Sequence, residues 1–307
     1  MTRNEQRLVL FATYSAQPAL TADDQLFADA LEHRGLTVRP AAWDDPAVAW
    51  QRAAVVIIRS TWNYHFHLGD FLDWAERVAS VTRLYNEPRV VRWNSHKRYL
   101  AELARGGVHV IETVFAEPGA RLALDEIAVA IASDDLVVKP AVSASAHETR
   151  RFGQQDRAEG QAHLDRLLAA RDVMVQPHVA ALAERGELSL LYACGRFSHS
   201  VRRRSALVDE GLMPKAARAD ASPTARAFAE RVLAVAARTI GVQPNDFLYA
   251  RVDLAELAPD DFVLLELELI EPSLFLVHAP EAADNFGDAL ADSMAYGRKA
   301  DPSLRSG

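Results

Sequence analysis

Charged residues recur at every second position on two neighbouring apolar segments near the end of the chain. The first segment carries Arg251 and Asp253, the second carries Glu266 and Glu268, and Glu271 follows closely. In an extended strand this spacing puts the charged side chains on one face. If the two strands pair as a hairpin, the carboxylates converge, and Mg²⁺ or Mn²⁺ is the natural cation to relieve their repulsion. A solvated strand face is the alternative, and the apolar residues in between argue against it.

Two lysines in the first half of the chain lie where an anion would suit them. Lys139 ends a buried apolar run, and an ammonium group there is costly unless an anion meets it. Lys97 lies on a predicted helix. A phosphate would satisfy both lysines. The alternatives are a lysine that extends from the strand to solvent at 139 and an ordinary surface lysine at 97.

Two loops and one further acidic residue complete the candidate nucleotide site. Ser143 and Ser145 lie in a run of small residues whose backbone amides could approach a phosphate, although solvent-facing turn residues are the ordinary interpretation. Glu187 could take a ribose hydroxyl or lie at the surface. An apolar strand ends abruptly at a segment whose backbone could meet an adenine edge: Gln176, Pro177, His178 and Val179.

The elements that must position these residues change character near residue 90. Before it, apolar strands alternate with amphipathic helices, which is typical of a small parallel sheet. The strands are predicted at 7–13, 38–41 and 54–58, and the helices at 21–34 and 68–79. Thr21 is the expected N-cap of the first helix, and Gly35 follows its end.

After residue 90 the pattern is that of an α+β body. Asn94 is predicted to cap a helix at 95–105. Strands are predicted at 108–114, 136–139, 173–176, 188–193, 196–202, 247–254 and 262–269, and further helices at 157–170, 223–239 and 282–296. We expect three domains, at 1–90, 91–180 and 181–307, with soft boundaries.

Composition excludes several classes of protein. A net charge of −8 disfavours nucleic acid as a partner. The one cysteine, Cys194, rules out an internal disulfide and fits a cytoplasmic location. No apolar stretch approaches the roughly 20 residues that span a bilayer, so no membrane association is expected. The motifs of P-loop, dinucleotide-binding, zinc-protease and serine-hydrolase sites are missing.

In order and spacing, the segments resemble the ATP-grasp superfamily and in particular its glutathione-synthetase-like ligases. The matches, over roughly residues 90–295, are Lys97, Lys139, the small-residue loop, the hinge strand at 176–179, Gly186-Glu187-Leu188-Ser189-Leu190, and the acidic strand pair. The resemblance implies an N-terminal α/β domain followed by a two-lobed ATP-grasp fold that holds ATP between its lobes. It also implies that Arg203 and Arg251 are catalytic residues beside the phosphates. Glu268 stands where the family has an asparagine, so which two of Glu266, Glu268 and Glu271 bind metal stays open.

A closer resemblance is to the subgroup that contains the O-ureido-serine cyclo-ligase, which forms D-cycloserine. It rests on the segments at 58–64, 91–94 and 269–274. Substrate contacts are then expected from Arg59, Ser60, Trp62 and Ser273. Arg59 could hold a substrate carboxylate in bidentate fashion. Packing between domains explains Trp62 and Tyr64 equally well.

Together with these residues, the resemblance implies an ADP-forming carboxylate–amine ligase that acts on small molecules through an acyl phosphate and, where acid and amine share a molecule, closes a ring. A homodimer is the default assembly. The alternatives are an ATP-grasp phosphotransferase and a nucleotide-binding module without turnover. A third alternative is a basic patch at 202–204 for RNA or an acidic partner.

Overall fold

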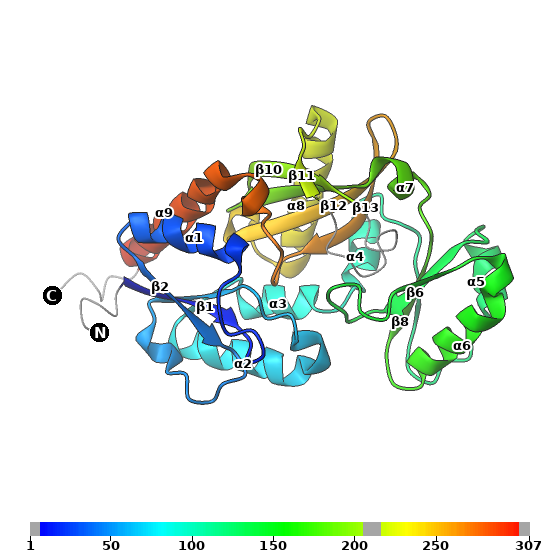
Figure 1. Ribbon diagram of the computed structural model, residues 1–307, viewed down its shortest axis with the longest axis horizontal. Helices are drawn as coiled ribbons and strands as arrows, with labels where there is room; N and C mark the ends of the chain where they lie inside the picture. The colour runs from blue at the N-terminus through cyan, green and yellow to red at the C-terminus, as the bar shows by residue number, and fades with distance from the viewer. Residues whose placement is uncertain (1–6, 205–215, 301–307) are drawn as a thin grey trace.

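The computed structural model describes residues 7–204 and 216–300, which form three sheets with their covering helices. In Figure 1 the N-terminal sheet lies to the left, the C-terminal sheet in the upper centre, and the middle sheet at the right. The predicted class, an α/β first part followed by two α+β parts, is confirmed. No helix in the described ranges has both the length and the apolar character needed to cross a bilayer.

The N-terminal sheet is parallel, with the strand order β2-β1-β3-β4. Val9 and Phe11 pack with helix α1 (Ala22–His33), whereas Leu10 and Ala12 pack with helix α2 (Leu68–Val81), because successive side chains of a strand point to opposite faces. The Thr21 side chain caps α1, as predicted. The strands are β1 (Leu8–Thr13), β2 (Thr37–Ala42), β3 (Val55–Ile58) and the short β4 (Arg83–Tyr85), which the sequence analysis missed.

The middle sheet is antiparallel, with the order β5-β8-β6-β7. Its strands are β5 (Val114–Ala116), β6 (Leu136–Pro140), β7 (Arg150–Phe152) and β8 (Val173–Pro177). The helices α5 (Leu124–Ala130) and α6 (Arg157–Leu168) bury its apolar side chains in one cluster. This body lies at the opposite end of the molecule from α9 (Figure 1).

The C-terminal sheet is antiparallel, with the order β11-β10-β9-β12-β13. Its strands are β9 (Glu187–Ala193), β10 (Arg196–Arg203), β11 (Ala216–Arg218), β12 (Tyr249–Ala258) and β13 (Asp261–Glu268). Helix α8 (Pro223–Ile240) packs on Leu188, Leu190 and Tyr192. Helix α7 (Ala181–Arg185) precedes β9, and α9 (Ala283–Ala300) packs beside α1.

The face of this sheet that turns away from α8 is divided along its length. At one end Leu191, Ala193 and Tyr249 are buried against the N-terminal sheet. At the other end Ala255 packs with Leu182 of α7. The charged residues predicted from the sequence lie between these two apolar contacts, so the sheet offers them a bounded polar strip.

Two expected elements were wrong. The predicted strand at 108–114 is a connecting segment in which only Val110 forms an isolated bridge to Leu264, and β5 begins at Val114. Asn94 does not cap a helix, because it is the last residue of α3 (Pro88–Asn94), and α4 (Tyr99–Arg105) begins five residues later. The Asn94 side chain instead pairs with the outer edge of β13, donating to the Leu267 carbonyl and accepting from the Leu269 amide, each at 2.8 Å.

We predict that Asn94→Ala lowers the free energy of unfolding by about 2–3 kcal/mol, because it leaves a buried carbonyl and a buried amide without partners. Urea denaturation followed by circular dichroism measures the change. Asn245→Ala, at an exposed position, is the control and should change stability little. An Asn94→Ala variant as stable as the control would show that the edge pairing contributes nothing.

Candidate functional site

Arg251 lies at the centre of the polar strip. It is 5% exposed, and its guanidinium group donates to both carboxylate oxygens of Asp253 at 3.0 Å and also to Glu268. A third contact goes to the Ser273 carbonyl at 3.3 Å, and the ring of Phe275 covers the group at 5.4 Å. The hairpin register sets Arg251 opposite Glu268 and Asp253 opposite Glu266, so the predicted convergence of these residues is confirmed.

Asp253 is fully buried, and its hydrogen-bond donors are two arginines and a serine hydroxyl. Besides Arg251, it accepts hydrogen bonds from Ser189 at 2.6 Å and from Arg203 at 2.9 Å. Arg203 also pairs with Glu187 at 2.7 Å. Burial alone would raise the pKa of Asp253, but the two arginines outweigh it and hold the pKa below its usual range. Ser189 was missed as a site residue although it occupies the serine position of the Gly186–Leu190 stretch.

Lys97 joins the early and late halves of the chain. Its ammonium group lies 3.0 Å from the Glu266 carboxylate and donates to the Ser143 carbonyl at 2.8 Å. Burial favours a raised pKa for Glu266, yet Lys97 and Lys139 hold that pKa below its ordinary value. Ser145, in contrast, is exposed, so only the first of the two predicted serines lies in this inner layer.

A cavity of about 100 Å³ lies between the middle and C-terminal sheets. Lys139 from β6 lines it together with Asp253 and Glu266 from the hairpin. Burial lowers the pKa of Lys139, while the nearby Glu266 raises it in part. Five more predicted residues line it: Gln176, Pro177, His178, Val179 and Glu187. Arg203, Glu268 and Glu271 do not line this cavity.

The predicted adenine side of this cavity is held by side-chain contacts that the sequence analysis did not foresee. The Gln176 amide donates to the Thr113 hydroxyl at 2.9 Å. The His178 ring lies 3.3 Å from Asp135, and its backbone amide donates to the Asp135 carbonyl at 2.8 Å. Thr113 and Asp135 are distant in sequence from the segment 176–179 and belong to no motif. Only the pairing of β8 with β5 and β6 brings them to this segment.

Two of the predicted metal ligands, Glu268 and Glu271, are shifted toward their protonated forms. Burial, with Glu266 and Asp253 nearby, raises the pKa of Glu268 above its usual range even though Arg251 opposes the shift. Burial and the neighbouring Glu268 raise the pKa of Glu271 to about 8. A cation bound beside these two groups would favour their charged forms and lower both pKa values.

The donor set suits a divalent cation with oxygen ligands, because Glu266 and Glu268 present carboxylates from one strand face. Within the described residues, however, no three histidine, cysteine, aspartate or glutamate side chains are already gathered around one point. Both oxygens of Asp253 already accept hydrogen bonds. A metal would therefore need these carboxylates to exchange arginine and lysine partners for the ion.

Arg59, at the end of β3, does not extend into an open site. It is 3% exposed, pairs with Asp24 at 2.7 Å, and donates to the Pro272 carbonyl at 2.8 Å. Only its Nη1 atom lacks a partner. The expected bidentate grip on a carboxylate is therefore wrong for this arrangement, since the other two nitrogens are engaged. Asp24 was missed, although its place in the first turn of α1 puts it beside the strand ends.

The other predicted substrate contacts lie around this arginine. The hydroxyls of Ser60 and Thr61 are buried and have no hydrogen-bond partner among residues 7–204 and 216–300. Trp62 is partly buried, and its carbonyl accepts from His65 Nδ1 at 2.9 Å. Ser273 contributes its carbonyl to Arg251, so its backbone is part of the site.

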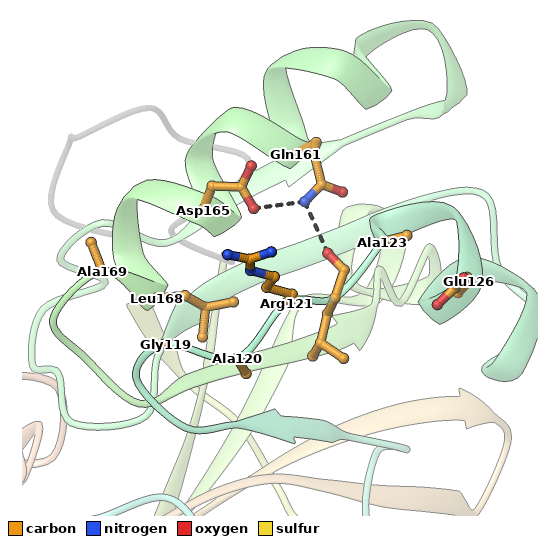
Figure 2. A pocket seen from close by; sticks show the side chains of 10 residues that line it. Gly119, Ala120, Arg121, Ala123, Glu126, Gln161, Asp165, Leu168 and Ala169 are labelled. Atoms are coloured by element: carbon orange, nitrogen blue, oxygen red, sulfur yellow. Dashed lines mark hydrogen bonds between the residues drawn. The ribbon is translucent and has the colours of Figure 1, made fainter.

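A wider hollow of about 800 Å³ lies between the segment 119–123 and α6 (Figure 2). Gln161 bridges its rim by donating to the Leu122 carbonyl at 2.9 Å and to Asp165 at 2.8 Å. It contains none of the predicted site residues, and the polar groups of Gln161 serve the fold.

Comparison with known proteins identifies relatives of this arrangement. Residues 9–86 match the family model described as the N-terminal domain of D-cycloserine synthetase DcsG. The cycloserine biosynthesis protein DcsG of Streptomyces lavendulae is 33% identical over 270 residues, which cover 85% of this chain and 90% of that protein.

Solved structures extend the likeness to the whole fold. The crystal structure of D-cycloserine synthetase DcsG superimposes with a TM-score of 0.86 at 31% identity, covering 94% of this chain and 99% of that one. The D-alanine–D-alanine ligase of Bacillus anthracis, solved with ATP, gives a TM-score of 0.64 at 11% identity over 96% and 99% of the two chains, a likeness of fold alone. With identity above 30% over most of both sequences, the chain belongs to the family of D-cycloserine synthetase DcsG, and it has the fold of ATP-grasp ligases such as PsnB, which is 17% identical with a TM-score of 0.62.

Proposed function

We propose that this protein joins the carboxylate of a small, amino-acid-like molecule to an amine, with release of ADP and phosphate. The observation that carries the proposal is the cavity in which Lys139, from the first half of the chain, lies with Asp253 and Glu266 from the second. Cations and carboxylates that share one cleft suit a triphosphate held with a divalent ion. The division into domains at 1–90, 91–180 and 181–307 is part of the proposal, supported by the three sheets.

In the proposed site the chain supplies positioning and charge. Lys97, Lys139 and Arg251 neutralise the phosphates, and the segment 176–179 with Glu187 holds the nucleoside. Arg203 lies 2.9 Å from Asp253. Once Asp253 binds a metal ion instead, the Arg203 guanidinium group is free to stabilise the negative charge of the transferred phosphoryl group. Mg²⁺, or Mn²⁺, held by Asp253 with two of Glu266, Glu268 and Glu271, would offset phosphate charge when bound.

The proposed chemistry begins with attack of the substrate carboxylate on the γ-phosphorus of ATP, which breaks the bond to ADP and forms an acyl phosphate. The amine nitrogen then attacks the acyl carbon, phosphate leaves, and the ammonium proton is released. Neither step needs a nucleophile from the protein, so positioning and electrostatic stabilisation are the contributions required of the chain.

The substrate is proposed to bind near the end of β3. The unpartnered atoms Arg59 Nη1, Ser60 Oγ and Thr61 Oγ1 belong to consecutive residues, and buried polar atoms of this kind favour a polar ligand. Trp62 and Ser273 would complete the contacts. Since DcsG carries the name D-cycloserine synthetase, we propose an acid and an amine within one molecule, so that the product is a ring. A cytoplasmic setting, which supplies ATP, is part of this proposal.

The test is an ADP-release assay with Mg²⁺ against a panel of amino acids and O-ureido-serine, with mass detection of products. We expect ADP, phosphate and a cyclised product in equal amounts from the cognate substrate. Phosphate transfer without an amine-dependent product would indicate a phosphotransferase instead. Nucleotide binding without ADP formation across the panel would contradict a ligase.

Lys139→Ala should weaken ATP binding by about ten- to a hundredfold, because it removes one buried charge that would pair with a phosphate. Isothermal titration with a non-hydrolysable ATP analogue and Mg²⁺ measures the affinity. Arg150→Ala, an exposed cation on the adjacent strand β7, is the matched control and should bind as the wild type does. Equal affinity in all three proteins would remove Lys139 from the site.

Asp253→Asn should reduce kcat by about a hundredfold or more while the variant still binds nucleotide, because the proposed metal site loses a charged ligand. Steady-state ADP formation measures the effect, and a thermal melt verifies folding. Glu256→Gln provides the control, because Glu256 is on the same strand but pairs with Arg202 at 3.1 Å. Wild-type turnover in a folded Asp253→Asn protein would contradict the assignment.

A further inference from the structure

The loop at 141–148, between β6 and β7, contains three non-glycine residues in the left-handed region of the backbone. Ser145, Ala146 and Glu148 have positive φ angles of 52°, 54° and 54°. Residues other than glycine rarely occupy this region, and such conformations persist when the surroundings hold them. The contacts that hold this loop therefore decide whether its amides can face a ligand.

Both ends of the loop are anchored within reach of the proposed nucleotide site. At the start of the loop, the Lys97 backbone amide donates to the Ala141 carbonyl at 2.9 Å, and the Lys97 ammonium group donates to the Ser143 carbonyl. At the far end, the Glu148 carboxylate accepts from Arg166 at 2.6 Å and also pairs with Arg171.

The middle of the loop makes a third contact, with residues that follow β3 of the N-terminal sheet. The His147 ring lies 5.0 Å from the ring of Phe66, almost edge-on at 78°, and 5.4 Å from His65. Ala144 packs against the hydrophobic cluster of the N-terminal sheet. The loop thus bridges the middle sheet and the segment in which substrate contacts are proposed.

Phe66 has no evident role in the hydrophobic core. It remains 54% exposed, and the ring contacts found for it in the described chain are those with His65 at 3.9 Å and with His147. His65 is suited to such packing, because burial lowers its pKa to about 4 and leaves the ring uncharged near neutral pH. An exposed aromatic side chain whose ring contacts within the described residues are with the loop and with its own neighbour points to a role in the loop's placement.

We propose that Phe66 and His147 are positioning residues for the ATP-dependent reaction, docking the loop at 141–148 so that it is ready to receive the phosphates. This inference rests on the proposed function. When the contact is lost, the loop spends less time docked and the apparent affinity for ATP falls by the same fraction. Saturating ATP restores the docked loop, so kcat changes little.

Hydrogen–deuterium exchange of peptides covering 141–149 tests the docking without any ligand. We expect Phe66→Ala and His147→Ala to raise exchange about three- to tenfold, the range for loss of an aromatic pair. Phe66→Tyr keeps the ring and should restore wild-type exchange. Val81→Ala is the matched control, since Val81 is also 54% exposed and lies on α2 of the same sheet.

ADP-release kinetics then test the consequence. We expect Phe66→Ala to raise KM for ATP about three- to tenfold while kcat stays within about twofold of the wild type. A protein that is merely less well folded would lose kcat at constant KM. Wild-type exchange and KM in both alanine variants would overturn the inference. If the wild-type enzyme forms no ADP, the proposed function fails, and the exchange result still decides the docking.

Discussion

The buried ion pair between Arg251 and Asp253 is the interaction on which the rest of the site depends. Both charges are removed from water, so each must keep an opposite partner, because a lone buried charge costs several kcal/mol. The pair draws in Glu268 across the hairpin and Arg203 from β10, and it fixes the segment after β13 through Ser273. Three elements that are separate in sequence thereby acquire one geometry.

The same segment after β13 is held from the other side by Arg59, which follows β3, and by Asp23 of α1. Arg59 donates to the Pro272 carbonyl, while Asp23 accepts from the amides of Leu274 and Phe275. The residues proposed to bind substrate and those proposed to bind metal are therefore joined by backbone contacts. Substitution of Arg59 or Asp23 would therefore alter the position of the segment after β13 and, through it, the geometry of the proposed metal-binding carboxylates.

The spacing of residue types predicted the structure correctly where that structure depends on neighbours in the sequence. Alternation along β12 and β13 predicted the charged strip, and amphipathic spacing predicted α1 and α2. It failed where the partner is distant in sequence. Asn94 has the chemistry of a helix cap, but its amide is used at the edge of β13, and Arg59 meets Asp24 rather than an open pocket. Such pairings depend on tertiary packing, which a single local pattern does not encode.

The small volume of the cavity beside Lys139 has a mechanical consequence. Sites for small molecules usually enclose about 300–1,000 Å³, whereas this cavity encloses about 100 Å³. The N-terminal and C-terminal sheets share one apolar cluster, whereas the middle sheet packs in a cluster of its own. Admission of a nucleotide would then require the middle sheet to move away from the C-terminal sheet on its connecting segments, which widens the cavity between them.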